Sequence, residues 1–177
     1  MDSPEQRARF EGLVLPHLSA AYNLARWLIR NPQDAEDLVQ EASMKAFRSF
    51  DAFRGGDCRA WLLAIVRNSC YTFLGRRRKP EEKVEFDEQQ HSSESAAATQ
   101  ESILIEEADR ESLKQALEQL PVEFREAIVL RELEGLSYRE ISDLTEVPVG
   151  TVMSRLSRGR QQLRERFAPP LRKEGRA

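Results

Sequence analysis

The sequence predicts an all-α fold of two small helical domains joined by a flexible acidic linker, with a helix-turn-helix in the C-terminal domain. Three observations lead to this prediction. Apolar residues recur at helical spacing in both ends of the chain, and no segment alternates apolar and polar residues as a strand would. The middle of the chain is polar and acidic. A stretch near the C-terminus combines a capping box, a turn and an arginine-rich helix.

Three helices are predicted in the N-terminal domain. The first covers roughly residues 4–30, beginning at Pro4 or Phe10. The pair Asn31-Pro32 ends it and begins the second, because asparagine is a good N-cap and proline suits the first helical position. After a glycine-containing loop, Asp57 is expected to cap a third helix over residues 61–73, which ends at Gly75.

The charge distribution separates the domains. Residues 1–80 carry a formal charge of +4, residues 81–120 carry −9 and residues 121–177 carry +2, although the whole chain is only −3. The polar segment that begins at Pro80 cannot bury enough apolar surface to offset its chain entropy. We therefore expect domains at 1–80 and 105–168, a linker at 81–104 and a tail at 169–177.

Residues 135–164 predict two helices around a tight turn. Ser137 and Glu140 form an S-x-x-E capping box at the start of the first helix. The turn position often held by glycine is Glu146, which must avoid positive φ or tolerate some strain. In the second helix Val152, Leu156, Gly159 and Leu163 share one stripe, and Ser154, Ser157 and Arg158 lie on the opposite stripe with Met153 at its margin. A small, polar and cationic helix face is what reading the DNA major groove requires.

Other residue types give weaker signals. Cys58 and Cys70, in a chain without a recognisable signal peptide, favour a reducing cytoplasm, and they are predicted to be buried small hydrophobes rather than a redox pair. His17 and His91 have no zinc-ligand spacing to each other or to the cysteines. No apolar run approaches the ~20 residues that span a bilayer. We expect no membrane insertion, no metal, no cofactor and no catalysis.

Two blocks of the sequence resemble a known family. Residues 34–41 (DAEDLVQE), 47–50 (FRSF) and 61–68 (WLLAIVRN) are similar to region 2 of extracytoplasmic-function sigma factors. Residues 120–163, with the segment GTVMSRL at 150–156, resemble region 4 of the same family. The order, spacing and total length agree over nearly the whole chain outside the linker and tail. The resemblance implies an alternative sigma factor that binds core RNA polymerase and directs promoter recognition and DNA opening.

The resemblance also implies roles for particular residues. The second helix would bind the clamp helices of the polymerase beta-prime subunit, and the beta subunit and an anti-sigma factor are further implied partners. The polymerase-binding residues would be Asp34, Asp37, Gln40, Glu41 and Met44. The residues for the minus-10 element would be Phe53, Arg54, Arg59, Arg67, Asn68, Arg76 and Arg77. Those for the minus-35 element would be Thr151, Met153, Ser154, Arg155, Ser157 and Arg158.

Other functions account for less of the sequence. A one-component helix-turn-helix regulator, acting without polymerase, explains the C-terminal motif and leaves the first block unexplained. A metal-dependent nuclease could use the acidic residues of 34–41, but these share one helix with no histidine among them, so a solvated helix face is the stronger interpretation. Without the family resemblance, the same solvated face would also be preferred over a protein-binding surface.

Overall fold

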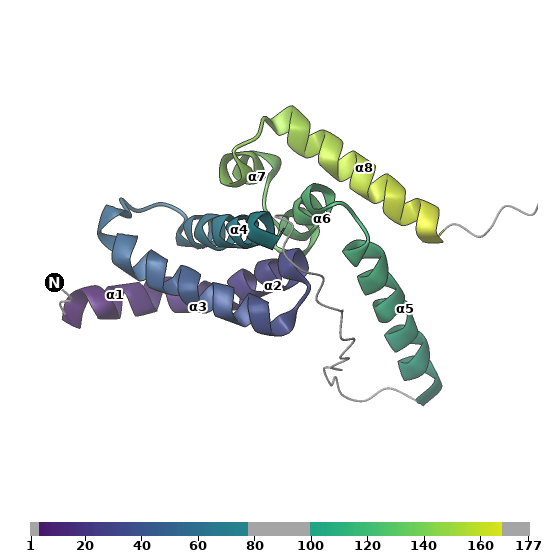
Figure 1. The fold of residues 1–177 in the computed structure, drawn as a ribbon, viewed down its shortest axis with the longest axis horizontal. Coiled ribbons are helices and arrows are strands. Elements are labelled where there is room, and N and C mark those ends of the chain that lie inside the picture. The colour runs from purple at the N-terminus through teal and green to yellow at the C-terminus, as the bar shows by residue number, and fades with distance from the viewer. Residues whose placement is uncertain (1–3, 78–99, 168–177) are drawn as a thin grey trace, which may run out of the picture.

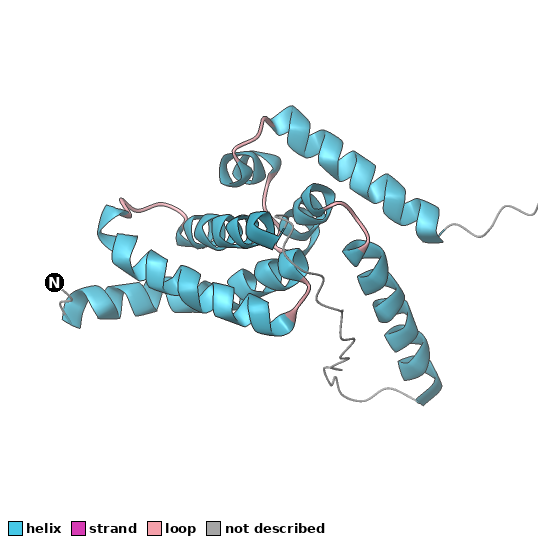
Figure 2. Cartoon of the chain, in the orientation of Figure 1, coloured by secondary structure: helices cyan, strands magenta, loops and turns pink. Residues whose placement is uncertain are grey.

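The described part of the chain is helical throughout. The computed structural model describes residues 4–77 and 100–167, and these ranges contain helices, turns and loops but no strand (Figures 1 and 2). Most of the predicted linker, the predicted tail and the first three residues lie outside the described residues. Within residues 4–77 and 100–167, no helix combines the length and the apolar character of a membrane span.

The N-terminal domain consists of four helices and two short 3₁₀ turns. The predicted first helix is divided into α1 (Pro4–Val14), the turn η1 (Leu15–His17) and α2 (Leu18–Ile29). Pro16 lies in this turn. It accounts for the break, because proline lacks an N–H group and its ring clashes with the preceding helical turn. The domain continues with α3 (Pro32–Ser49), η2 (Phe50–Ala52) and α4 (Cys58–Arg77).

The predicted caps of this domain are confirmed. The Asn31 side chain accepts a hydrogen bond from the Asp34 N–H at 3.0 Å and begins α3 at Pro32. Asp57 accepts from the N–H groups of Arg59 and Ala60 at 2.9 and 3.2 Å. Helix α4 nevertheless begins three residues earlier than predicted and passes through Gly75 to Arg77. Glycine only weakens a helix, so it does not by itself end one.

The C-terminal domain begins with α5 (Gln100–Glu118), which starts inside the range predicted as linker. It continues with α6 (Val122–Ile128), the π turn η3 (Val129–Leu133), α7 (Tyr138–Thr145) and α8 (Val149–Phe167). Gly159 lets α8 pack closely on α6, since a Cβ built there would lie 2.8 Å from Ile128 Cδ1 and 3.3 Å from Phe124 Cβ.

The two domains pack against each other. Helix α6 lies against α2, and α7 lies against α4 (Figure 1). The buried apolar side chains of both domains form one continuous cluster, from Phe10 and Leu24 in the first to Leu130 and Leu156 in the second. This arrangement places the helix-turn-helix beside α4.

Candidate nucleic-acid interface

The capping box fixes the start of the helix-turn-helix. Ser137 Oγ accepts from the Glu140 N–H at 3.2 Å, and Glu140 Oε2 accepts from the Ser137 N–H at 2.6 Å, as predicted. Hydrogen bonds from the Ser137 side chain and backbone to the Glu140 carboxylate lower its pKa. The carboxylate is therefore held charged at the positive end of the helix dipole, where it stabilises α7.

The turn between α7 and α8 uses a left-handed residue. Glu146 adopts φ 56° and ψ 38°, so this non-glycine residue tolerates positive φ rather than avoiding it. The conformation directs the Glu146 N–H to the Ser142 carbonyl, and Ser142 Oγ donates to the Val147 carbonyl at 2.6 Å. The small Ser142 thus joins the end of α7 to the residue that precedes Pro148.

Helix α8 has a buried face and an exposed face, as the sequence indicated. Val152, Leu156 and Gly159 are buried against the domain. The side chains expected to read the minus-35 element divide by exposure. Ser154, Ser157 and Arg158 are exposed, and 53% of Met153 is exposed, whereas Thr151 and Arg155 are half-buried at the margin.

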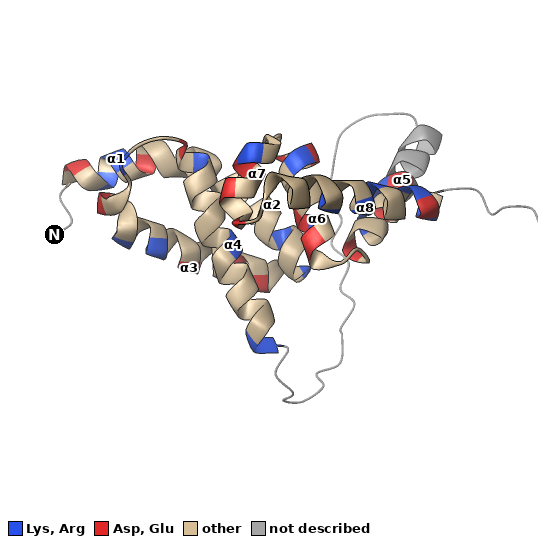
Figure 3. Ribbon diagram, turned by 90° about the horizontal axis from the view of Figure 1, so that it is seen from above, with Lys and Arg blue, Asp and Glu red and all other residues tan. Residues whose placement is uncertain are grey.

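The outer face of α3 carries the residues expected to bind polymerase. Asp37, Gln40, Glu41 and Met44 are exposed, and Asp34 is half-buried. Lys45 lies 2.7 Å from Glu41 and lowers the pKa of that carboxyl. Arg77 approaches Asp34 at 3.6 Å. This face is therefore acidic, with partial neutralisation by Arg77 and Lys45. Figure 3 marks the positions of acidic and basic residues along the helices.

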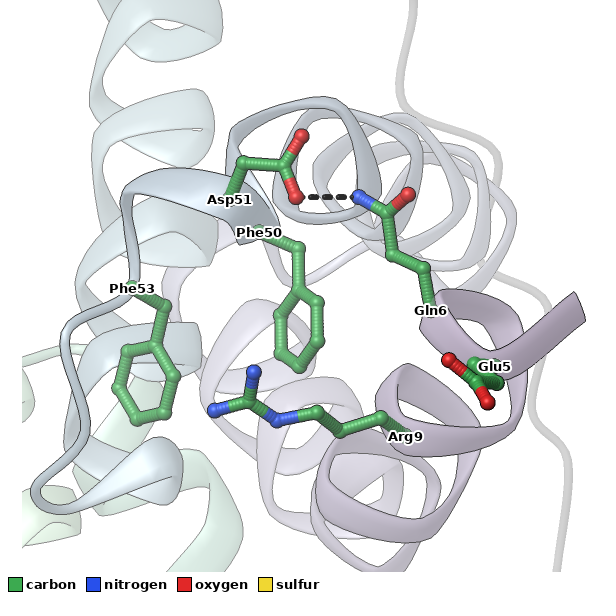
Figure 4. Close-up of a pocket in the computed structure, with 6 residues that line it drawn as sticks. All are labelled: Glu5, Gln6, Arg9, Phe50, Asp51 and Phe53. Carbon is green, nitrogen blue, oxygen red and sulfur yellow. Dashed lines mark hydrogen bonds between the residues drawn. The ribbon is translucent and has the colours of Figure 1, made fainter. Parts of the chain in front are cut away.

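The loop before α4 adjoins an aromatic cluster. Phe53 lies 5.0 Å from Trp61 and 6.0 Å from Phe50, measured between ring centroids. A cavity of about 370 Å³ next to the loop is lined by Phe50 and Phe53, by the Arg9 guanidinium over the Phe50 ring, and by Gln6, which donates to Asp51 (Figure 4). Phe53 is half-buried in this cluster, which gives the loop an apolar anchor and leaves Arg54 exposed.

The cationic residues expected at the minus-10 element are in two different environments. Arg54, Asn68, Arg76 and Arg77 are exposed. Arg59 and Arg67 instead bind carboxylates of the C-terminal domain. Arg67 Nε lies 2.6 Å from Glu126 Oε1, and Arg59 Nη2 lies 2.5 Å from Glu134 Oε2. In this conformation both guanidinium groups are paired with carboxylates.

Glu126 is the centre of a buried polar group that sequence reasoning missed. Its side chain is 1% exposed, and it accepts from Arg67 and from the Tyr71 hydroxyl, the latter at 3.0 Å. The Arg67 guanidinium also stacks 4.3 Å from the centre of the Tyr71 ring. Burial raises the pKa of the Glu126 carboxyl, while the hydrogen bonds and charge of its partners act in the opposite direction. The one sequence signal for burial of Glu126 is its position directly before the apolar run 127–130.

Comparisons with known proteins agree with both halves of this arrangement. The family model for Sigma-70 region 2 matches residues 13–79, and that for Sigma-70, region 4 matches residues 110–163. The ECF RNA polymerase sigma-E factor of Escherichia coli K12 is 37% identical over 147 residues, which cover 79% of this chain and 77% of that protein. The chain belongs to the extracytoplasmic-function sigma factors.

Further relatives of this sigma factor cover different lengths. The RNA polymerase sigma-H factor of Pseudomonas aeruginosa is 34% identical over 92% of this chain and 88% of its own. The ECF RNA polymerase sigma factor SigE of Mycolicibacterium smegmatis is 38% identical over 159 residues. The matched region spans 62% of the length of SigE.

Solved structures show the same fold. The sigma factor RpoE from Bartonella quintana, in complex with the anti-sigma factor NepR, has a TM-score of 0.70 and 31% identity over 90% of this chain and 96% of its own. CnrH, in complex with the cytosolic domain of CnrY, has a TM-score of 0.63 and 26% identity over 91% and 88% of the two chains.

Proposed function

We propose that this sigma factor binds core RNA polymerase, directs it to promoters and takes part in opening the DNA there. The observation that carries the proposal is that one chain of this family presents both an exposed acidic face on α3 and an exposed polar and cationic face on α8. A one-component regulator needs only the second of these features. It would leave the region-2 match over residues 13–79 without a role.

Helix α3 is the proposed polymerase contact. Exposed carboxylates beside an exposed methionine suit a protein partner, because methionine adapts its shape to an opposing apolar surface. The proposed partner surface is the clamp helices of the beta-prime subunit. Asp37 and Glu41 would contribute most, since they lie one helical turn apart and share a face.

One DNA contact is proposed in each domain. The exposed face of α8 would enter the minus-35 major groove, where Arg158 has the donor geometry for guanine. Arg155 would contact phosphates, which position the protein without reading sequence. The loop at Phe53 and Arg54, with the cationic side of α4, would hold the separated minus-10 strand, since that task needs cations for phosphates and aromatic rings for unstacked bases.

We expect this chain to act in the cytoplasm, where RNA polymerase works, and to have an inhibitory protein partner. The expectation of a partner comes from the two neighbours in complexes, RpoE with NepR and CnrH with the cytosolic domain of CnrY. The structural matches cover 90% and 91% of this chain.

The test is reconstitution with core RNA polymerase. The double charge reversal Asp37→Lys with Glu41→Lys should abolish co-purification with the core enzyme and promoter-directed transcription, because like charges would then oppose the partner surface. Helix content and binding of duplex promoter DNA by α8 should stay unchanged. Transcript-start mapping with the unaltered chain would then identify its promoters.

The matched control is Glu11→Lys with Asp109→Lys, which makes the same charge change at exposed positions on α1 and α5. It should co-purify with the core enzyme as the unaltered chain does. If the α3 variant co-purifies as well as the control, the acidic face is only a solvated helix surface.

A further inference from the structure

The interface between the two domains is built around arginines that the proposed function assigns to DNA. Arg67 is 13% exposed and makes a two-point contact with Glu126, with Nε at 2.6 Å from Oε1 and Nη2 at 3.4 Å from Oε2. A guanidinium has a planar fork that binds a carboxylate or a phosphate in the same two-point manner. The fork of Arg67 is therefore already occupied by an anion of DNA-like geometry.

The second arginine also binds a glutamate of the C-terminal domain, but through one guanidinium nitrogen rather than two. Arg59 Nη2 donates to the Glu134 carboxylate at 2.5 Å and to the Glu134 carbonyl at 2.7 Å. The Glu134 side chain is 6% exposed and that of Arg59 is 29% exposed. Glu134 directly precedes the helix-turn-helix, so this contact also holds that motif against the start of α4.

Neither domain satisfies these charges by itself. Among the described contacts, the ion-pair partners of Glu126 and Glu134 are on α4, and a buried carboxylate that loses its partner is strongly destabilised. When the domains separate, both carboxylates become hydrated and both guanidinium groups are released. Phosphates of a DNA strand can then replace the carboxylates of Glu126 and Glu134. Arg59 and Arg67 therefore have an anionic partner in both the closed and the DNA-bound state.

We propose that the free chain adopts a closed, self-inhibited form in which Glu126 and Glu134 stand in for DNA phosphates on Arg67 and Arg59. The separated promoter strand and the C-terminal domain compete for the same two guanidinium groups. Promoter opening therefore requires the domains to move apart first. The inference rests on the proposed function in one respect, since it takes Arg59 and Arg67 as DNA contacts.

The test uses the full chain without polymerase. Glu126→Gln with Glu134→Gln keeps the shape of both side chains and removes their charge. A fluorescein-labelled oligodeoxythymidylate serves as the single-stranded probe. We expect its affinity to rise about tenfold, which is within the usual range of coupling between two sites. Small-angle X-ray scattering should show a larger radius of gyration for the variant than for the unaltered chain.

The matched control is Glu111→Gln with Asp143→Asn. It removes two negative charges at exposed positions in the C-terminal domain, where Glu111 pairs only within its own helix, with Lys114 at 3.7 Å. This control should leave the radius of gyration unchanged and raise the affinity far less. An equal gain in the control, or a larger radius without a gain in affinity, would overturn the competition.

A single substitution protects the test against loss of folding. Glu134→Gln changes the more exposed of the two ion pairs. It should raise the affinity for the probe and the radius of gyration by smaller amounts than the double variant does, with an unchanged helical circular-dichroism spectrum. No change in either variant would overturn the closed form. The radius of gyration is measured without DNA, so an unchanged radius would mean that the closed form itself fails. A larger radius without a gain in affinity would instead mean that the assignment of Arg59 and Arg67 to DNA fails.

Discussion

Gly159 shows how a single residue sets the packing of the C-terminal domain. It is buried on α8, and the side chains of Ile128 and Phe124 occupy the space where its Cβ would lie. Ile128 is itself 5% exposed, so it has little room to move away. The absence of a side chain at this position is therefore what allows α6 and α8 to pack closely.

Replacing Gly159 with alanine should lower the free energy of unfolding by about 1 kcal/mol. Overpacking a filled core costs ~1–3 kcal/mol, and replacing a helical glycine with alanine regains up to ~1 kcal/mol. Urea denaturation would measure the change. Gly150→Ala is the control, since its Cβ would enter open space at the start of the same helix and should not destabilise. A stabilised Gly159→Ala protein would contradict this account of the packing.

Cys70 provides a pH-dependent test of burial. The side chain is fully buried, and burial raises the pKa of its thiol from 9.0 to about 12. The folded state thus disfavours the thiolate, so stability is unaffected below the ordinary thiol pKa and decreases as pH rises from there towards 12. The stability difference between the unaltered chain and Cys70→Ala should shrink over that interval in urea titrations. A difference that is constant with pH would mean that the thiol titrates normally.

At the scale of helices, local chemistry made the sequence informative. The caps at Asn31, Asp57 and Ser137 were predictable because each depends on residues within three positions along the chain. The same holds for the two faces of α8. The break at 15–17 was missed because the apolar pattern continues across it, although Pro16 was a visible signal.

Arg158 offers the sharpest test of α8. Arg158→Ala should weaken minus-35 recognition by ~1–3 kcal/mol if the side chain meets a base edge. Binding titrations with promoter variants would show the loss at one base position and little elsewhere. Arg164→Ala removes the same charge from the exposed last part of the helix and should weaken all promoters equally. The same uniform loss with Arg158→Ala would assign Arg158 to phosphate contact.

At the scale of the whole molecule, the sequence is least informative. Its patterns predict two helical domains but do not indicate that the domains pack together. The pair Arg67 and Glu126 is separated by 59 positions, and no local pattern connects residues so far apart. Charge and family resemblance assign Arg59 and Arg67 to DNA, but neither indicates what a side chain binds in the free chain.

Arg125 strengthens the contact between the domains without an ion pair. Arg125 is 4% exposed, and its guanidinium donates to the carbonyls of Glu118 and Leu120 at 2.8 and 3.1 Å, and to the Leu28 carbonyl at 3.5 Å. Burial lowers the pKa of this group. The charge is thus placed against the carbonyl ends of α5 and α2, where helix dipoles favour a cation.

The ion pair between Arg67 and Glu126 limits how such chains can exchange parts during evolution. A recombination event that joined this N-terminal half to the C-terminal half of a relative would bring a foreign residue to position 126. An apolar residue there would leave Arg67 largely buried without a counter-charge, whereas a carboxylate would preserve the contact. The two positions are therefore expected to be inherited together, and hybrids between paralogues should be viable only where the residues at this seam match.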